Sequence, residues 1–489
     1  MDPLSLWSYR VLGALALPAA LVLPVFRGRF GLRWGDRLGY TLCGGSEPVW
    51  IHGASVGETR SAVLLLSALR DLEPDLPATL TSGTPAGLMF LERELERRAA
   101  KTKTGPDDRT QIAAPPLDFW GAPGRYLDRL GPRVLVLIET EIWPELIHQC
   151  HRRGIGVVML SARLSERSHR RLRRLKGVFG SVLRQISLIA TIGRQDLERF
   201  LDLGCDPDKV FAAGSPKFDD LIGQARKNLA RFAGSDARGR EGEKGEKGEN
   251  DPAGADGGPP VILAGSTHPG EEAVILRAFG ELEPGAARLA LAPRHLERVP
   301  EACGLVRDLG LVPLLHSEAG TLAAGPNEVV VVDRMGLLAD LYRQADVALV
   351  GGSFLEGAGH NPLEPAACGV PVVFGPHMSS FQAEAGILLD AGAARQSPPA
   401  LLGAALSRYL GDPGLAGRSG LSGLKALAAL EPAGPVLARI LLDFLAAPAP
   451  RRDGAFLAGL RKLVPRTADG GARDGRPTVF PSEPAGRRL

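Results

Sequence analysis

Short apolar segments that end in small residues alternate with amphipathic segments along most of this chain. Between residues 47 and 222 the apolar segments are "PVWIHGAS", "ATLTSGT", "QIAAPPLD", "RVLVLIET", "GVVMLSAR", "SLIATIG" and "KVFAAGS". The segments "SAVLLLSALRDL" and "LMFLERELERR" lie among them and carry apolar residues at helical spacing. Such an alternation predicts an α/β fold in which helices cover both faces of a parallel sheet.

A charged, glycine-rich segment at residues 233–259 interrupts the alternation. It repeats GEK and is rich in Gly, Asp and Pro, so it cannot bury a core, and we predict a disordered linker or insert. Strand-like segments resume at "PVILAGST", "ARLALAPRH", "NEVVVVDRMG", "DVALVGGS" and "VPVVFGPH". We therefore expect two Rossmann-like, doubly wound domains, at residues 31–232 and 260–445, and a disordered tail at 446–489. Ligands bind such folds at the C-terminal ends of the strands, so we expect a ligand cleft between the domains.

The N-terminal segment, residues 1–30, has the composition of a membrane anchor. Residues 11–26 carry no charge, and arginines follow at once. A bilayer span needs about 20 apolar residues, and counting from Leu4 reaches that length if the Arg10 side chain extends to the membrane surface. The arginines predict that the chain lies on the cytoplasmic face of the inner membrane. The alternatives are a buried helix and a cleaved signal peptide, and Asp2 argues against the latter.

Composition excludes several classes of protein. The formal net charge is only +3, which indicates no overall preference for nucleic acid. Five cysteines are scattered without a C-x-x-C pair, which indicates reduced thiols and neither a disulfide framework nor a zinc site. The chain lacks the G-x-x-x-x-G-K-[ST] motif, so it does not resemble a P-loop ATPase.

A glycine-rich loop follows the strand-like segment that ends at Gly351. The sequence "GGSFLEGAGHNPLEP" places Asn361 as the N-cap of a helix and Pro362 at its first position. Helix N-termini bind phosphate through free N–H groups, and the Glu364 carboxylate in the first turn can accept hydrogen bonds from ribose hydroxyls. The alternative is an ordinary capped helix in which Glu364 complements the dipole. The glycines and a second carboxylate, Glu356, favour a nucleotide site.

Further loops follow strand-like segments in the same domain. Arg294 follows "LALAP", and Met335 and Gly336 follow "VVVVDR". An arginine in such a loop can bind a phosphate through two parallel N–H bonds, whereas the alternative is a surface salt bridge. The turn "GSTHPGEE" is another loop that can close over a ligand.

In the first domain, three charged residues stand at the ends of strand-like segments. Glu58 follows "HGASVG", Glu139 lies at the end of "RVLVLIET", and Lys217 follows "VFAAGSP". Their shared position at C-terminal strand ends predicts that they face the ligand. The alternative for each is helix capping or simple solvation.

Basic residues gather between residues 163 and 184, where Glu166 is the single acid. One interpretation is a solvated helix face, and the other is a docking surface for an anionic membrane or a phosphorylated lipid, which the N-terminal segment favours. Phe179 is the single phenylalanine, tyrosine or tryptophan among these charges, which offers little base stacking, so we expect no nucleic-acid partner. The basic residues are Arg163, Arg167, Arg170, Arg171, Arg173, Arg174, Lys176 and Arg184.

Taken together, these motifs resemble the Kdo transferases, glycosyltransferases that add 3-deoxy-D-manno-oct-2-ulosonic acid (Kdo) to the lipid A precursor. The resemblance is carried by "HGASVGE", "LIETEIWPE", "ARLSERS", "GSPKFD", "GSTHPGEE", "APRH" and "GHNPLE", which occur in the family's order between Trp34 and His377. It implies a GT-B architecture of two Rossmann-like domains facing a cleft. It also implies CMP-Kdo as donor, lipid IVA as acceptor, no cofactor, no metal ion and inversion at the anomeric carbon.

The resemblance also assigns roles to residues. It implies that Glu58 is the general base that takes the proton from a sugar hydroxyl of lipid A as its oxygen attacks Kdo. Glu139 and Lys217 would stabilise charge in the transition state. CMP would be bound by Pro293, Arg294, Met335, Gly336, Leu337, Asn361, Pro362, Leu363 and Glu364. The alternatives are another GT-B enzyme, such as a nucleotide-sugar 2-epimerase, and a non-catalytic membrane scaffold.

Overall fold

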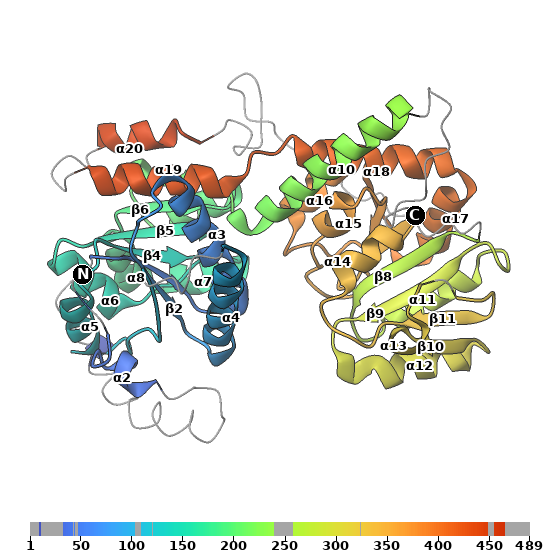
Figure 1. Ribbon diagram of the computed structural model, residues 1–489, viewed down its shortest axis with the longest axis horizontal. Coiled ribbons are helices and arrows are strands. Elements are labelled where there is room, and N and C mark those ends of the chain that lie inside the picture. The colour runs from blue at the N-terminus through green and yellow to red at the C-terminus, as the bar shows by residue number, and fades with distance from the viewer. Residues whose placement is uncertain are drawn as a thin grey trace, which may run out of the picture. The chain divides into compact units, whose positions relative to one another are not determined.

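The structure of the protein is a computed structural model, which describes residues 9–10, 33–42, 44, 47–102, 109–119, 121–238, 258–322, 324–447 and 454–464. The chain divides into two compact units (Figure 1). Unit 1 contains Met1–Asp219 and Pro432–Leu489, and unit 2 contains Asp220–Glu431. Within the described ranges, each unit is built on one seven-stranded sheet whose paired strands are all parallel, which confirms the predicted α/β class.

The unit 1 sheet has the strand order β3-β2-β1-β4-β5-β6-β7. The chain builds outward from β1 to β3 and then returns to the other side of β1 with β4, so the topological switch point lies between β1 and β4. All of these strands were predicted from the sequence. They are β1 (Val49–Gly53), β2 (Ala78–Ser82), β3 (Thr110–Ala113), β4 (Val134–Ile138), β5 (Gly156–Ala162), β6 (Leu188–Thr191) and β7 (Val210–Ala212).

Helices cover both faces of this sheet because alternate strand residues bury apolar side chains on opposite sides. Val49 and Ile51 of β1 belong to one core cluster, whereas Trp50 between them belongs to the other. The first face is covered by α3 (Val56–Leu72), α4 (Pro85–Thr102), α19 (Ala433–Ala446) and α20 (Gly454–Arg461). The second is covered by α5 (Ala122–Leu130), α6 (Pro144–Arg152), α8 (Lys176–Leu183) and α9 (Arg194–Asp202). The short α2 spans Trp34–Arg37, and α7 spans Glu166–Arg174.

The helix α19 belongs to unit 1 although unit 2 precedes it in the chain. It contacts α3, and its buried residues, such as Leu437 and Phe444, join the same core cluster (Figure 1). The carboxylate of Asp219 fixes its first turn, since Oδ1 accepts from Ala433 N at 2.8 Å and Oδ2 from Gly434 N at 2.6 Å. The chain therefore leaves unit 1 after residue 219 and returns to it at residue 432.

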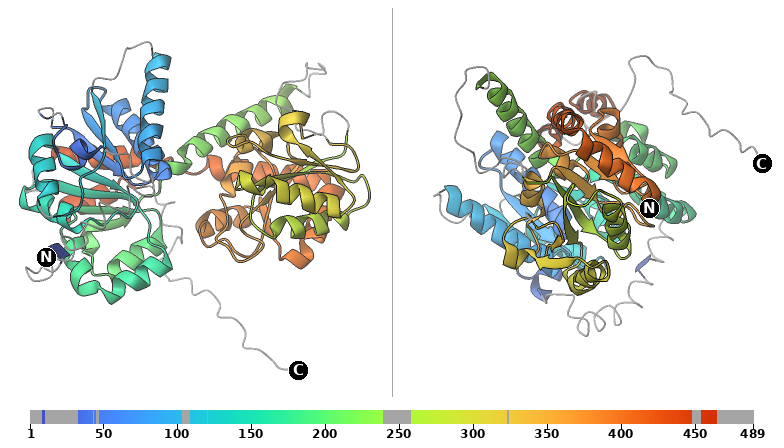
Figure 2. Two further views of the ribbon diagram at one scale, coloured as in Figure 1. Left: turned by 90° about the horizontal axis from the view of Figure 1, so that it is seen from below. Right: turned by 90° about the vertical axis from the view of Figure 1, so that its right-hand side faces the viewer.

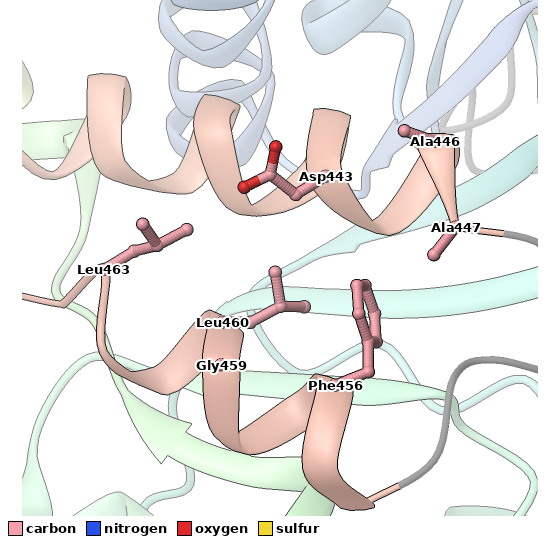
Figure 3. A pocket seen from close by; sticks show the side chains of 7 residues that line it. All are labelled: Asp443, Ala446, Ala447, Phe456, Gly459, Leu460 and Leu463. Carbon is pink, nitrogen blue, oxygen red and sulfur yellow. The ribbon is translucent and has the colours of Figure 1, made fainter.

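A pocket of about 500 Å³ opens between α19 and α20. Figure 3 shows its lining, in which Asp443 is the acidic side chain among apolar ones. Asp443 pairs with Arg439 at 3.0 Å along α19. None of the site residues predicted from the sequence lines this pocket, which is formed by Asp443, Ala446, Ala447, Phe456, Gly459, Leu460 and Leu463.

The unit 2 sheet has the order β10-β11-β9-β8-β12-β13-β14, with its switch point between β8 and β12. Its strands are β8 (Val261–Thr267), β9 (Arg288–Pro293), β10 (Val312–Leu315), β11 (Glu328–Val331), β12 (Val347–Val350), β13 (Val372–Phe374) and β14 (Ala394–Gln396). Its helices are α11 (Glu271–Gly280), α12 (Val299–Asp308), α13 (His316–Ala319), α14 (Leu338–Leu341), α15 (Leu363–Ala367), α16 (Gln382–Asp390), α17 (Leu402–Gly411) and α18 (Pro413–Ala428).

The helix α10 (Asp219–Arg238) begins where the chain enters unit 2 and packs against that unit. It is the long green helix in Figures 1 and 2. Arg226 donates to the carbonyl oxygens of Ala428 at 3.0 Å and Leu430 at 2.9 Å, and Asn228 Nδ2 donates to Ala367 O at 2.8 Å. The residues of α10 after Asp219 thus belong to unit 2, although the sequence analysis placed residues up to 232 in the first domain.

Other predicted boundaries also differ from the structure. Residues 432–445 were predicted to belong to the second domain, but they form most of α19 in unit 1. Part of the tail predicted as disordered at 446–489 is the helix α20, whose Leu457 and Leu460 are buried in the unit 1 core. Most of the predicted linker at 233–259 lies outside the described residues.

Two residues of the predicted anchor are described, and both bind unit 1. The Tyr9 hydroxyl donates to Asp118 Oδ2 at 2.7 Å, and the Arg10 guanidinium donates to both carboxylate oxygens of Glu145 at 2.9 Å. The Glu145 side chain is fully buried, so the prediction that Arg10 extends to a membrane surface is wrong. The rest of the anchor at residues 1–30 lies outside the described part of the chain. Among the helices that the structure describes, none has the length and apolar character that crossing a bilayer requires.

Candidate active site

The turn from β1 into α3 positions Glu58 at the carboxyl edge of the unit 1 sheet. A Cβ atom on Gly53 would lie 2.8 Å from Glu58 C and 2.9 Å from Thr59 N, so a glycine is required where the helix starts against the strand. Ser55 has extended backbone angles and is the N-cap of α3. Its Oγ accepts from Glu58 N at 3.4 Å, and Glu58 Oε2 accepts from Ser55 N at 3.0 Å, which is a capping box.

The capping box holds the Glu58 carboxylate by one of its two oxygens. Ala54 N also donates to Oε2, so two backbone N–H groups fix this atom. Among the described residues, Oε1 has no hydrogen-bond partner, and the side chain is half-buried. The carboxylate is therefore oriented by its own turn and keeps one oxygen for another group. Glu58 does cap its helix, as the alternative interpretation predicted. The cap uses only Oε2, so it is compatible with a role for Oε1 as a proton acceptor.

Glu139 stands at the end of β4, across the switch point from the β1 turn. Its backbone is left-handed, with φ of 60°, a conformation that non-glycine residues rarely adopt and that is common at functional sites. Its N–H donates to Leu160 O at 2.9 Å, which ties it to β5. Burial raises the pKa of Glu139, and the nearby negative charge of Glu58 raises it further, whereas Lys217 lowers it.

The structure thus brings together the three residues that the sequence analysis singled out in the first domain. Glu58 and Lys217 both act electrostatically on Glu139, and Arg163 adds a second positive charge. Lys217 is exposed at a short 3-10 helix after β7, where its N–H donates to Ser215 Oγ at 3.4 Å. The arrangement places two carboxyl groups beside cations at one sheet edge, which suits proton transfer and charge stabilisation.

Sequence reasoning missed Glu141 in this cluster. Its Oε2 accepts from Trp143 Nε1 at 2.7 Å. Burial is the main cause that raises the pKa of Glu141, and the charges of Glu58 and Glu139 act in the same direction. The residue lies within the quoted motif "LIETEIWPE", but its side chain could be assigned to the cluster only once the turn after β4 was known.

In unit 2 the predicted donor-binding residues lie at or beyond the ends of three strands, β9, β11 and β12. Pro293 ends β9 and Arg294 follows it, with Arg294 N donating to Thr267 O of β8 at 3.0 Å. The loop after β11 carries Met335, Gly336 and Leu337, and the loop after β12 leads to Asn361–Glu364. Since β11, β9, β8 and β12 are adjacent, these loops share the carboxyl edge of the sheet. Arg294 and Met335 are exposed, Gly336 has φ of 85°, and Leu337 packs partly into the core.

The predicted helix start at Asn361 is shifted by one residue. Pro362 is the N-cap, and α15 runs only from Leu363 to Ala367. Asn361 still satisfies the turn, because its Oδ1 accepts from Leu363 N at 3.1 Å and its Nδ2 donates to Glu364 Oε1 at 3.4 Å. A five-residue helix has few aligned peptide dipoles, so its N-terminus offers less to a phosphate than the prediction assumed.

Imidazoles from two loops of this edge also meet, and the sequence analysis did not single them out. His268 follows β8, His360 precedes Asn361, and their Nε2 atoms lie 2.8 Å apart. The buried carboxylate of Glu271 beneath them accepts from the backbone N–H groups of His268, Gly352 and Phe354. Both histidines lie inside motifs quoted from the sequence, but the contact between them depends on the pairing of β8 with β12.

The helix α7 carries five of the eight basic residues predicted for docking. None of its residues is buried. Arg167, Arg171 and Arg174 are exposed, whereas Arg170 pairs with Glu166 at 3.4 Å and Arg173 with Asp202 at 3.7 Å. The helix begins with the N-cap Ser165, just beyond β5, at the same edge as Glu58 and Glu139.

Comparisons with known proteins identify the family. The model described as 3-deoxy-D-manno-octulosonic-acid transferase (kdotransferase) matches residues 32–220. The 3-deoxy-D-manno-octulosonic acid transferase of Bordetella pertussis is 33% identical over 401 residues, which cover 81% of this chain and 85% of that protein. This chain belongs to the 3-deoxy-D-manno-octulosonic acid (Kdo) transferase family. It is therefore an enzyme, a glycosyltransferase, and the predicted family is confirmed.

Solved structures show the fold that this Kdo transferase shares with other enzymes. A glycosyltransferase from Rickettsia africae has a TM-score of 0.52 at 11% identity, covering 82% of this chain and 98% of that one. The UDP-GlcNAc 2-epimerase from Neisseria meningitidis has a TM-score of 0.51 at 12% identity, covering 81% of this chain and 99% of that one. The GT-B-like fold is therefore common to transferases and epimerases, and the family membership decides between the predicted alternatives.

Proposed function

We propose that this Kdo transferase moves Kdo from CMP-Kdo to the lipid A precursor, lipid IVA, with Glu58 as the general base. The observation that carries the proposal is the position of the Glu58 carboxylate at the switch point of unit 1, with Oε2 fixed by backbone N–H groups and Oε1 without a partner among the described residues. A general base needs both a fixed orientation and a free oxygen, because it must lie within about 2.6–3.2 Å of the hydroxyl it deprotonates.

In the proposed reaction an acceptor hydroxyl oxygen attacks the anomeric carbon of Kdo, and its proton passes to Glu58. The bond between that carbon and the phosphate oxygen breaks, and its electron pair leaves with CMP. A single displacement of this kind inverts the anomeric carbon. Glu139 and Lys217 would balance the charges that develop near Glu58. Support for this comes from the effects of Glu58 and Lys217 on the pKa of Glu139.

The donor nucleotide would be bound by the loops at the carboxyl edge of unit 2. Arg294 would contact the phosphate with its guanidinium, while Pro293, Met335, Gly336 and Leu337 would contact the nucleoside beside it. The segment Asn361–Glu364 would contribute its backbone and the Glu364 carboxylate. Support comes from the position of all these residues on loops that follow adjacent parallel strands.

We also propose that the enzyme works at the cytoplasmic face of the inner membrane. Residues 1–30 would anchor it, and the exposed arginines of α7 would contact anionic lipid. Tyr9 and Arg10 bind close to the N-terminus of α6, which follows β4, so the N-terminal segment meets unit 1 at the edge that carries Glu139. A lipid acceptor would then reach the enzyme on its membrane-facing side.

The test is a transfer assay with the full chain, CMP-Kdo generated in situ and a tetra-acylated lipid A precursor. Mass spectrometry of the lipid product counts the Kdo residues added. A parallel reaction with excess EDTA tests the proposal that no metal ion is needed, and we expect the same product yield. Failure to add Kdo to the lipid would overturn the proposed function, and loss of product with EDTA alone would overturn its metal independence.

A further inference from the structure

The contact between His268 and His360 dictates how the two rings are protonated. Their Nε2 atoms lie 2.8 Å apart and the ring centroids 5.0 Å apart. One Nε2 must donate and the other accept, so the pair shares a single proton across this contact. Burial, followed by the charges of His268, Arg294 and His295, lowers the pKa of His360 to about 4. At neutral pH the His360 ring is therefore uncharged when no anion is present.

The backbone holds the two rings in place from both sides of the switch point. His268 N donates to Glu271 Oε2 at 2.8 Å, and the same carboxylate accepts from Gly352 N at 2.6 Å and Phe354 N at 2.9 Å. His360 N donates to Gly351 O at 3.2 Å. The glycines are required, because a Cβ atom on Gly351 would lie 2.3 Å from Ser266 O. These bonds fix the backbone segments from which the two rings extend.

The groups that face the pair are mainly cationic or able to donate N–H bonds. Arg294 lies on the neighbouring loop, and the ring of His295 is 6.3 Å from that of His268. Glu297 lies 3.9 Å from His295 Nδ1. The Glu271 carboxylate is occupied by the three backbone N–H groups. The surroundings therefore disfavour positive charge on His360 until an anion compensates for it.

One more proton on the pair would break its internal hydrogen bond. Both Nε2 atoms would then carry hydrogen, and neither could accept from the other. An oxyanion offers two or more acceptor oxygens, so it can accept hydrogen bonds from both N–H groups at once. Its negative charge also stabilises the added positive charge on the pair. Binding of the anion and uptake of the proton are then the same event.

We propose that His268 and His360 form an oxyanion-binding pair at the unit 2 switch point, which exchanges its internal hydrogen bond for two bonds to the ligand as it takes up one proton. The inference rests on the proposed function for its ligand, since CMP-Kdo carries both a phosphodiester and a sugar carboxylate. The phosphate gains a second negative charge when the bond to the sugar breaks, and the proton held by the pair lies where it compensates for that charge.

The experiment is calorimetric titration of the full chain between pH 6 and 8. The probes are the methyl phosphodiester of CMP, which has no titratable phosphate proton near neutral pH, cytidine, and free Kdo. Repeating each titration in buffers of different ionisation enthalpy gives the number of protons taken up. We expect the phosphodiester to bind with uptake of about one proton and more tightly at lower pH, and cytidine to bind without uptake.

Two variants decide the outcome. His268→Gln and His360→Gln should each weaken phosphodiester binding about tenfold, remove its proton uptake and leave cytidine affinity unchanged. If affinity and proton uptake are lost for free Kdo and not for the phosphodiester, the oxyanion that the pair binds is the sugar carboxylate, and the proposal holds for that group. Unchanged affinity and proton uptake for both anions in folded variants would overturn it. Thermal unfolding identifies a misfolded variant, and then the other one is used.

These outcomes are separable from the proposed function. A chain that binds the phosphodiester with proton uptake but adds no Kdo to the lipid precursor retains the anion site and refutes the lipid transfer. A chain that transfers Kdo normally while both variants bind the anions like the wild type refutes the histidine pair alone.

Discussion

Ser55 and Glu58 bind each other reciprocally at the start of α3, with the serine Oγ accepting from the Glu58 N–H and the glutamate Oε2 accepting from the Ser55 N–H. The carboxylate proposed as the general base is thus also part of the cap that holds its helix. Structural and chemical roles coincide in one side chain, so a substitution must be chosen to separate them.

Glu58→Gln is the substitution that separates the two roles. Glutamine also completes a capping box, so the helix start should survive, but an amide cannot accept the hydroxyl proton. We expect Kdo transfer to fall by about 10²–10⁴-fold while CMP affinity stays the same. The control is Ser55→Ala, which should lower stability by about 1 kcal/mol and keep most of the transfer activity. Normal turnover by Glu58→Gln would remove Glu58 from the mechanism.

Arg294→Ala should weaken CMP binding about tenfold or more, since a hydrogen bond to a charged group contributes about 1.5–3 kcal/mol. Arg294→Lys should recover part of the affinity, because lysine keeps the charge but not the planar pair of N–H groups. The matched control is Arg408→Ala, which removes an exposed arginine of α17. Isothermal titration with CMP measures the difference, and equal affinity in the Arg294 and Arg408 variants would contradict the assignment.

Arg10→Met should lower the midpoint of thermal unfolding more than the double substitution Arg10→Met/Glu145→Gln. The single change leaves the buried Glu145 carboxylate without its guanidinium, whereas the double change removes the charge as well. The exposed pair of Arg194 and Glu198, whose side chains are 68% and 61% exposed, is the control, and its loss should cost less than about 1 kcal/mol. If the changes in unfolding midpoint caused by Arg10→Met and by Glu145→Gln add up to that of the double substitution, the two side chains are not coupled.

Asp118 should make stability depend on pH. Burial raises its pKa to about 6, although the hydrogen bonds from Tyr9 and Leu146 act in the opposite direction. A carboxyl whose pKa is higher in the folded state binds its proton more tightly there, so this contribution is full below about pH 4 and is lost as the pH rises to about 6. Between pH 4 and 6 the free energy of unfolding, measured with denaturant, should therefore fall by about 2 kcal/mol more in the wild type than in Asp118→Asn. Parallel curves for the two proteins would rule out this titration.

The exposed arginines of α7 should contribute to membrane binding. Replacing Arg167, Arg171 and Arg174 by glutamine should weaken binding to vesicles with anionic lipid about 100-fold, at about 1 kcal/mol per basic residue. Flotation of the full chain with such vesicles, at low and high salt, measures the effect. The control replaces Arg277, Arg307 and Arg408 of unit 2, which gives the same net charge. An equal loss in both triple variants would indicate a general charge effect and no docking surface.

The sequence predicted every strand of the unit 1 sheet but missed the two edge strands of the unit 2 sheet. Apolar runs such as those of β4 and β12 are buried on both faces, which makes them easy to recognise. The missed strands β10 and β14 are edge strands, and their side chains are largely accessible. β10 contains Pro313, and β14 is three residues long with Arg395 and Gln396. Edge strands need no continuous apolar run, so their sequences carry little signal.

Contacts between distant segments were likewise beyond the sequence pattern. The apolar face of α19 predicts that the helix covers a sheet, but not which one. In the structure its apolar residues join the unit 1 core, and Asp219 accepts the N–H groups of its first turn. Strand-end positions did predict that Glu58, Glu139 and Lys217 lie at one edge, since parallel strands in one sheet end on the same side. The His268 contact with His360 joins loops that are 92 residues apart, and no local spacing encodes it.

The return of the chain to unit 1 sets the order in which the protein can be completed on the ribosome. Unit 2 is one uninterrupted stretch and can finish folding as soon as it emerges. The sheet of unit 1 is synthesised earlier, yet the apolar surface that α19 covers stays open until synthesis reaches about the last eighth of the polypeptide. The half of the enzyme that is made first is therefore the half that matures last.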